Sequence, residues 1–285
     1  MARIEPQSAN DYDDRTTAAV KFVLVEIGQI LGSFRGKFAV IGGAVPWLLL
    51  SESDMSHIGT ADVDLSLDAE ALGDGEYVRL VESLQAQGYN QRDNLSQFQL
   101  VRTVPARDGG PDIDVVVDFL MPREVEIAKN TPPLISNFAV QRADGADLAL
   151  KFHQMVAIDS EMPDGGHNRV HIAVASIPAL LAMKGYAIAN RQKRKDAYDI
   201  YFCIRNFPDG LDALVAETKT LLEVDTARKG YLLIAEKFRD VDDFGPTSVR
   251  QFVQGSDALG ERTADQWQQD AFGQVNAWLV ELGLR

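Results

Sequence analysis

A change in hydrophobic periodicity after Ser176 constrains the fold more than any other feature of this sequence. Before this residue, short apolar segments alternate with period two and are separated by glycine-containing turns, which is typical of strands. After it, apolar residues recur three and four positions apart almost to residue 285, as in amphipathic helices. We therefore predict an α+β fold, with a domain built on a mixed sheet over residues 18–175 and a helical domain over residues 176–285.

The clearest strand signal is residues 62–67, where polar and apolar side chains alternate strictly. Residues 97–104 and 113–120 flank an Asp-Gly-Gly sequence and are expected to form a hairpin. Other strands are predicted at 38–41, 137–142, 148–153 and 170–174, and helices at 18–31, 45–50, 77–84 and 267–282.

Composition excludes several classes of protein. No apolar segment reaches the ~18 residues that a membrane span needs. The N-terminus has no apolar core of a secretory signal, and the single cysteine, Cys203, fits a reducing compartment. We therefore expect a cytoplasmic protein without a membrane partner.

The net charge of −14, from 28 basic and 42 acidic residues, disfavours a long nucleic-acid track. Local contact remains open through a basic cluster formed by Arg191, Lys193, Arg194 and Lys195. The alternative interpretation of this basic cluster is a solvated helix end, where cations are favoured by the helix dipole.

Two predicted strands carry carboxylates in register. Asp62 and Asp64 are two residues apart on one strand, so they share a face and repel each other. The second strand carries Asp112, Asp114 and Asp118 at the same period. A divalent cation such as Mg²⁺ would offset this repulsion, and paired metals in phosphoryl transfer need carboxylates from neighbouring strands. The structural alternative is an exposed acidic edge strand.

Gly42 and Gly43 follow one predicted strand and precede a helix. Backbone N–H groups at such a turn can hold phosphate. A dinucleotide-binding turn is set aside, because it requires Gly-x-Gly-x-x-Gly. The simpler alternative is a turn that needs glycine only for its backbone angles.

Lys184 lies within the apolar stripe of residues 177–188, where an ammonium group must meet an anion or reach solvent. Asp199 is the expected partner, since it lies beside the apolar face of the next predicted helix. Asp196 on the same helix is interpreted as an N-terminal cap or a nucleotide-binding residue. A purely structural Lys–Asp pair is the alternative.

Together these motifs resemble the AbiEii-like nucleotidyltransferase family of the polymerase-beta-like superfamily, known from abortive-infection and toxin–antitoxin systems. The resemblance covers residues 38–205 and rests on an ordered set of segments: 40–44 (Val-Ile-Gly-Gly-Ala), 60–65 (Thr-Ala-Asp-Val-Asp-Leu), 116–120 (Val-Val-Asp-Phe-Leu), 181–184 (Leu-Ala-Met-Lys) and 191–200. The superfamily often has Gly-Ser at the glycine pair, and this chain offers no hydroxyl there.

The resemblance implies a nucleotidyltransferase-type mixed sheet and transfer of NMP from an NTP to an acceptor. Asp62, Asp64 and Asp118 would converge to bind Mg²⁺, with Asp118 also helping to deprotonate the acceptor. Lys184, oriented by Asp199, would neutralise triphosphate charge. Gly42, Gly43 and Asp196 complete the expected nucleotide-binding set.

The acceptor stays open at this stage. Some members of the family are toxins that modify tRNA 3′ ends, so an RNA or protein acceptor, contact with tRNA through the basic cluster, and a cognate antitoxin are all implied. Two alternatives remain: a small-molecule nucleotidyltransferase of the aminoglycoside-modifying type, and a non-catalytic interaction module on the same fold.

Overall fold

The computed structural model describes residues 6–34, 36–68, 76–93, 95–123 and 141–285. Contacts divide the chain into two compact units, each described by itself below. The first contains residues Asp14–Ala44 and Thr60–Ala175, and the second contains Glu5–Asp13, Val45–Gly59 and Ser176–Arg285. Unlike the sequential division expected, two N-terminal segments belong with the C-terminal helices.

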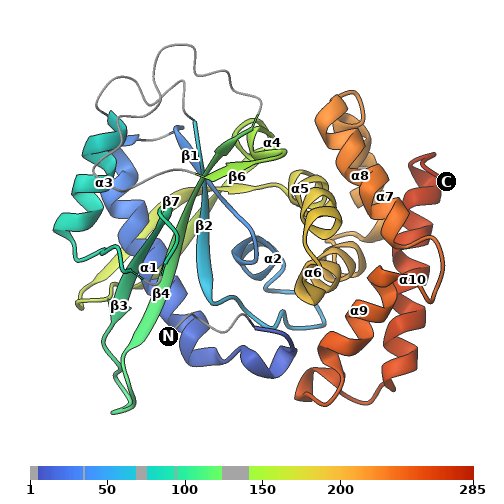
Figure 1. The fold of residues 1–285 in the computed structure, drawn as a ribbon, viewed down its shortest axis with the longest axis horizontal. Helices are drawn as coiled ribbons and strands as arrows, with labels where there is room; N and C mark the ends of the chain where they lie inside the picture. The colour runs from blue at the N-terminus through green and yellow to red at the C-terminus, as the bar shows by residue number, and fades with distance from the viewer. Residues whose placement is uncertain (1–5, 35, 69–75, 94, 124–140) are drawn as a thin grey trace. The chain divides into compact units, whose positions relative to one another are not determined.

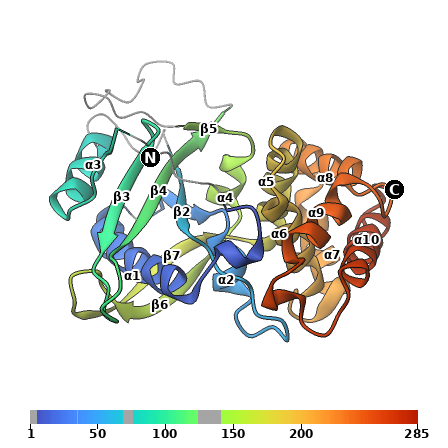
Figure 2. The ribbon, with the colours of Figure 1, turned by 60° about the horizontal axis from the view of Figure 1, so that its bottom comes forward.

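The first unit is built on a mixed seven-stranded sheet with the order β3-β4-β2-β1-β7-β6, and β5 pairs with β4 (Figures 1 and 2). The strands are β1 (Phe38–Ile41), β2 (Asp62–Leu67), β3 (Gln99–Val104), β4 (Ile113–Pro122), β5 (Gln141–Ala143), β6 (His153–Glu161) and β7 (His167–Ala175). The β1–β7, β2–β4 and β4–β5 pairs are parallel, and the β1–β2, β3–β4 and β6–β7 pairs are antiparallel.

Helices cover both faces of this sheet. Those of the first unit are α1 (Asp14–Ile30), α3 (Glu76–Ala86) and α4 (Ala146–Lys151), with a 3-10 turn, η2 (Leu31–Phe34). The hydroxyl of Ser66 on β2 donates to the carbonyl of Ala146 at 2.9 Å, which fixes α4 on one face. On the opposite face, Arg102 of β3 donates through Nε to Glu26 Oε2 of α1 at 2.9 Å. The candidate carboxylates of β2 therefore lie on the α4 face, because residues 62, 64 and 66 share one side of the strand.

The second unit is helical in its described part. Its elements are η1 (Ala9–Asp11), most of α2 (Ala44–Leu49), α5 (Ile177–Asn190), α6 (Arg194–Arg205), α7 (Gly210–Leu221), α8 (Asp225–Lys237), α9 (Phe244–Val253), η3 (Asp257–Leu259) and α10 (Ala264–Glu281). α5 begins where the sequence predicts the change of periodicity, and the Ser176 side chain accepts from Ala179 N at its N-cap. α10 begins with a capping box of Thr263 and Gln266.

One predicted strand needs correction, and another lies partly outside the described residues. The segment 148–153 is mainly helix α4, because Ala, Leu and Lys favour helix and the alternation of its leucines imitates period two. Of the segment 137–142, residues 137–140 lie outside the described residues, and β5 begins at Gln141. Strand β6 has no counterpart among the predictions. In the described ranges, no helix has the length and apolar character needed to cross a membrane.

Candidate functional site

The candidate metal-binding carboxylates lie on two neighbouring strands of the first unit. Asp62 and Asp64 are two residues apart on β2, so their side chains leave the same face. In the parallel pairing of β2 with β4, the direct partner of Asp64 is Asp118. Partners on adjacent strands share a face, and neighbouring strands lie about 4.8 Å apart. The fold thus brings all three residues to one area of one face.

The side chains of these residues have different polar partners. Thr60 Oγ1 donates to Asp62 Oδ1 at 3.1 Å, and Gln99 Nε2 donates to Asp118 Oδ1 at 2.9 Å. Within the described ranges, no three His, Cys, Asp or Glu side chains are grouped so that they could hold a metal ion. The convergence of the three carboxylates on a metal ion therefore stays a prediction. All three are half-buried rather than enclosed, so a change of rotamer can redirect them.

The glycine turn lies beside the carboxylate of Asp64. β1 ends at Ile41 and α2 begins at Ala44, so Gly42 and Gly43 form the turn that the sequence predicts. Gly42 has a φ of 71°, in the left-handed region that favours glycine. A β-carbon at Gly42 would stand 1.8 Å from Asp64 Oδ2, so the carboxylate fills the place of the missing side chain. Gly42 is therefore required by the turn and by Asp64 together.

Two further acidic residues of the β3–β4 hairpin have structural partners. Asp114 accepts from Thr103 Oγ1 at 2.7 Å and from Arg92 NH2 at 2.9 Å. Asp112 lies just before β4 and accepts from the backbone N–H of Ala106 at 3.0 Å. The hairpin fixes both carboxylates, which leaves Asp118 as the acidic residue of β4 beside Asp64.

Lys184 of α5 lies in a buried ion-pair cluster of the second unit. Only 6% of the Lys184 surface is exposed to solvent. The ammonium Nζ is 2.6 Å from Asp196 Oδ1 and 2.7 Å from Asp199 Oδ2, both on α6. The expected contact with Asp199 is present, and Asp196 shares the lysine. Burial alone would lower the pKa of Lys184, but these two carboxylates outweigh burial and raise it. The lysine is therefore fully charged.

Asp196 and part of the basic cluster belong to the same network. Arg191 Nε donates to Asp196 Oδ2 at 2.8 Å, and Lys195 Nζ donates to Asp199 Oδ1 at 2.9 Å. Asp196 is buried in the first turn of α6. It is not the N-cap residue, as one interpretation of the sequence proposed, because Lys193 occupies that position. Three cations against two carboxylates leave the network with one net positive charge. Two members of the basic cluster are thus already engaged in ion pairs.

His57 is a member of this network that the sequence interpretation missed. Its ring lies in the segment Val45–Gly59, and its Nε2 is 3.1 Å from Asp199 Oδ1. The two residues are 142 positions apart. No local pattern could have paired them, because an isolated histidine between α2 and β2 carries no periodic signal. Burial, followed by the charge of Lys195, lowers the pKa of His57 to about 4.

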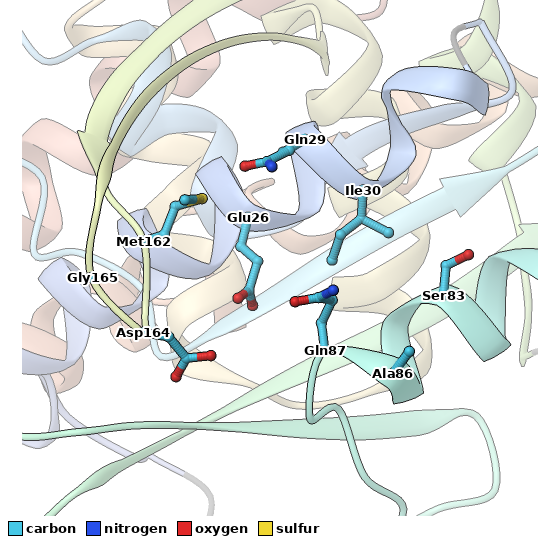
Figure 3. A pocket seen from close by; sticks show the side chains of 9 residues that line it. All are labelled: Glu26, Gln29, Ile30, Ser83, Ala86, Gln87, Met162, Asp164 and Gly165. Atoms are coloured by element: carbon cyan, nitrogen blue, oxygen red, sulfur yellow. The ribbon is translucent and has the colours of Figure 1, made fainter.

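A pocket of about 480 Å³ in the first unit is separate from these groups. Figure 3 shows side chains of α1, α3 and the β6–β7 turn around it, including Glu26, Gln87 and Asp164. Glu26 also accepts from Arg102, which lies on the face of the sheet opposite the candidate carboxylates. This pocket is therefore not formed by the candidate catalytic residues.

Comparison with known proteins identifies a family and several similar solved structures. A family model described as "Nucleotidyl transferase AbiEii toxin, Type IV TA system" matches residues 60–274. A comparison with curated proteins gives no match. The chain is similar to the crystal structure of an antigenic nucleotidyltransferase-like protein from Paracoccidioides brasiliensis, with 16% identity and a TM-score of 0.40 over 77% of this chain and 94% of that chain. It is also similar to JHP933 from Helicobacter pylori, with 10% identity and a TM-score of 0.47 over 95% of each chain.

Proposed function

Because the chain belongs to the AbiEii family of nucleotidyl transferase toxins of type IV toxin–antitoxin systems, we propose that it transfers NMP from an NTP to an acceptor in a Mg²⁺-dependent reaction. The observation that carries the proposal is the register of β2 and β4, which pairs Asp64 directly with Asp118 and leaves Asp62 on the same face. Family membership also implies, in general terms, an NTP substrate and an antitoxin partner.

The residues present fit a hard divalent cation. Mg²⁺ prefers carboxylate oxygens and is commonly held by one or two protein carboxylates together with substrate phosphates. Asp62, Asp64 and Asp118 offer such oxygens from adjacent strands and are half-buried, so substrate could reach them. Bound there, the metal would offset the negative charge that develops on the phosphates. For this, the carboxylates of Asp62 and Asp118 would turn from their hydrogen bonds with Thr60 and Gln99.

The chain's own groups have distinct parts in the proposed reaction. An acceptor hydroxyl attacks the α-phosphorus in line, the bond from that phosphorus to the bridging oxygen breaks, and pyrophosphate leaves. Asp118 is the candidate base for the acceptor proton. Gln99, which donates to Asp118 Oδ1, would release this oxygen when Mg²⁺ binds. The backbone at Gly42 and Gly43 is the proposed contact for phosphate.

Electrostatics of the second unit supports phosphate binding by a group of residues rather than by one lysine. Lys184 directs its charge at two carboxylates, whereas the side chain of Arg191 is half exposed. We propose that Lys184 and Asp196 hold Arg191 in place and that the net positive charge of this network neutralises the triphosphate. Asp199 orients Lys184 in this proposal.

The proposed acceptor is RNA, with the tRNA 3′ end as the first choice from the family, or a protein. A specific observation favours a second candidate, a small cationic acceptor: the net charge of −14 repels RNA, and part of the basic cluster is neutralised by Asp196 and Asp199. A cation would be attracted by the same field.

The test is transfer of α-labelled NMP. The wild-type protein is incubated with each of four NTPs, with Mg²⁺ or EDTA, and with total tRNA, a protein mixture or an aminoglycoside as acceptor. We expect metal-dependent labelling of one acceptor class, lost in Asp64→Asn and Asp118→Asn. Asp114→Asn is the matched control on the same strand and face, and it should retain activity.

Two outcomes would contradict the proposal. Labelling that persists in Asp118→Asn but is lost in Asp114→Asn would move the site along β4. No labelling with any NTP, together with no Mg²⁺–NTP binding by calorimetry, would favour the non-catalytic interaction module.

A further inference from the structure

His57 occupies a fully enclosed position in the second unit. Its side chain is 1% exposed. The imidazole ring packs edge-on against Phe202, with ring centroids 4.8 Å apart, and tilted against Tyr198 at 5.8 Å. Buried polar rings are stable only when their nitrogens have hydrogen-bond partners. Both nitrogens of His57 have one.

These partners determine which nitrogen carries the proton. The backbone N–H of Gly59 donates to Nδ1 at 3.2 Å, so Nδ1 must offer a lone pair. The proton then lies on Nε2, which donates to Asp199 Oδ1 at 3.1 Å. A neutral ring with this tautomer has no free lone pair for proton transfer, which excludes His57 as a general base.

Three segments of the second unit contact the Asp199 carboxylate. The His57 ring from the segment Val45–Gly59 and Lys195 from α6 form hydrogen bonds with Oδ1, and Lys184 from α5 forms an ion pair with Oδ2. Both lysines are flexible point charges, whereas the imidazole is a rigid ring locked by aromatic packing. The ring therefore adds a rigid, directional hydrogen bond to the stronger attraction of the two ammonium groups, and it fixes Oδ1 so that Oδ2 faces Lys184.

The other side of the ring holds the turn that leads into β2. Gly59 has a φ of 89°, which the hydrogen bond to His57 Nδ1 helps to fix. Thr60 follows directly, and its hydroxyl donates to Asp62 Oδ1. One ring thus contacts both the carboxylate that binds Lys184 and the turn immediately before the acidic residues of β2.

From these contacts we propose that His57 is a positioning residue for nucleotidyl transfer: its ring orients Asp199 toward Lys184 and fixes the Gly59 turn that precedes Asp62. The inference rests on the proposed function for its catalytic consequence. Residues that orient a functional group through hydrogen bonds typically change activity about tenfold to hundredfold when they are replaced.

Three substitutions separate the two hydrogen bonds from the packing. His57→Phe keeps an aromatic ring but removes both bonds. His57→Gln can present an amide N–H to Asp199, and His57→Asn can offer an oxygen to Gly59 N–H. His171→Phe, at an exposed position of β7, is the matched control. Each variant is checked by circular dichroism and thermal unfolding, and assayed below its unfolding transition.

We expect kcat of His57→Phe to fall about tenfold or more, with the KM for the acceptor unchanged. His57→Gln should recover part of the loss, because it restores the donor to Asp199. The control should match wild type. A wild-type kcat in His57→Phe would overturn the proposal. So would an equal decrease of kcat in His57→Phe and His57→Gln that is fully explained by their decrease in stability.

A measurement without turnover separates this inference from the proposed function. Nitrogen NMR of the wild-type imidazole should show a protonated Nε2 and an unprotonated Nδ1. The ammonium signals of Lys184 and Lys195 should shift in His57→Phe, because Asp199 loses its hydrogen bond from the ring and can reorient between the two lysines. If the protein transfers no nucleotide but these signals behave as stated, only the proposed function fails. Unchanged ammonium signals would mean that His57 does not orient Asp199.

Discussion

The carboxylate of Asp64 lies where Gly42 would carry its side chain, so that a β-carbon at Gly42 would stand 1.8 Å from Asp64 Oδ2. Strand β1 and strand β2 pair antiparallel, with Ile41 opposite Asp64. The glycine turn and Asp64 therefore depend on each other. A side chain at position 42 would displace the Asp64 carboxylate from its present place.

This relationship predicts the effect of Gly42→Ala. The methyl group would push Asp64 aside and would also force alanine into the left-handed region, which costs about 1 kcal/mol or more. We expect metal-dependent NTP binding to be lost and stability to fall, as measured by calorimetry and urea unfolding. Gly109→Ala is the control: Gly109 has a φ of 78° with nothing within 4 Å of an added β-carbon. It should lose similar backbone energy and keep NTP binding.

The double substitution Asp62→Asn with Asp64→Asn should abolish Mg²⁺-dependent NTP binding without lowering metal-free stability. It removes repulsion between two like charges on one strand face, and partly exposed charges interact by roughly 0.2–1 kcal/mol. An asparagine at position 62 can still accept from Thr60. Thermal unfolding in EDTA should give a Tm equal to or above that of wild type. A clear decrease would show that these carboxylates hold structural hydrogen bonds.

Lys184→Met should lower both stability and NTP turnover. Removing one partner of a buried ion pair costs about 3–5 kcal/mol. We expect a cost near the lower end of this range, because Asp196 remains paired with Arg191 and Asp199 remains paired with Lys195. Urea unfolding measures the change, with Lys151→Met as control. Lys151 forms an exposed pair with Asp147, and its loss should cost below about 1 kcal/mol. Equal effects of the two substitutions would contradict the buried network.

His57 predicts a pH dependence of stability. Its pKa is about 4 in the folded chain and 6.5 ordinarily, so the unfolded chain takes up a proton first as the pH falls. Stability is therefore present above pH 6.5 and is lost toward pH 4, by about 2 kcal/mol between about pH 7 and pH 5. Asp199, Lys184 and Lys195 face the ring. The pKa of Asp199 is held well below 3.8 and that of Lys184 is raised, so these two groups keep their charge in this window. Urea unfolding of His57→Gln should show a smaller pH dependence than wild type, and an unchanged one would refute the assignment.

Local patterns predicted the elements that carry the candidate carboxylates. The alternation of residues 62–67, the glycine pair after β1 and the Asp-Gly-Gly hairpin are complete within a few residues, so β1, β2, β3 and β4 follow from sequence. The stripe from Trp267 to Leu282 likewise predicted α10, and its members are buried. In α4, leucines alternate with other helix-forming residues, and this alternation led to the wrong prediction of a strand at 148–153.

The contacts that could not be predicted join distant segments. Asp199 was expected beside Lys184, because both lie near apolar stripes of adjacent helices. The sharing of Lys184 with Asp196 and the bond from His57 depend on how helices pack, which no spacing encodes. The side-chain directions of Asp62 and Asp118 depend in the same way on Thr60 and Gln99. The spacing of the aspartates therefore predicts which face of the sheet their carboxylates share, but not their rotamers.

The distance between His57 and Asp199 along the chain has a consequence for biosynthesis. During translation, His57 leaves the ribosome while the residues that surround it, in α6, are still to be made. Its ring can be buried only after position 199 has emerged, and long-range pairing of this kind forms slowly. A nascent or truncated chain ending near residue 175 would contain every candidate metal ligand yet lack Asp199, Tyr198 and Phe202, which surround the His57 ring. If Lys184 and His57 act as proposed, full activity would be reached only after α5 and α6 have been made and packed.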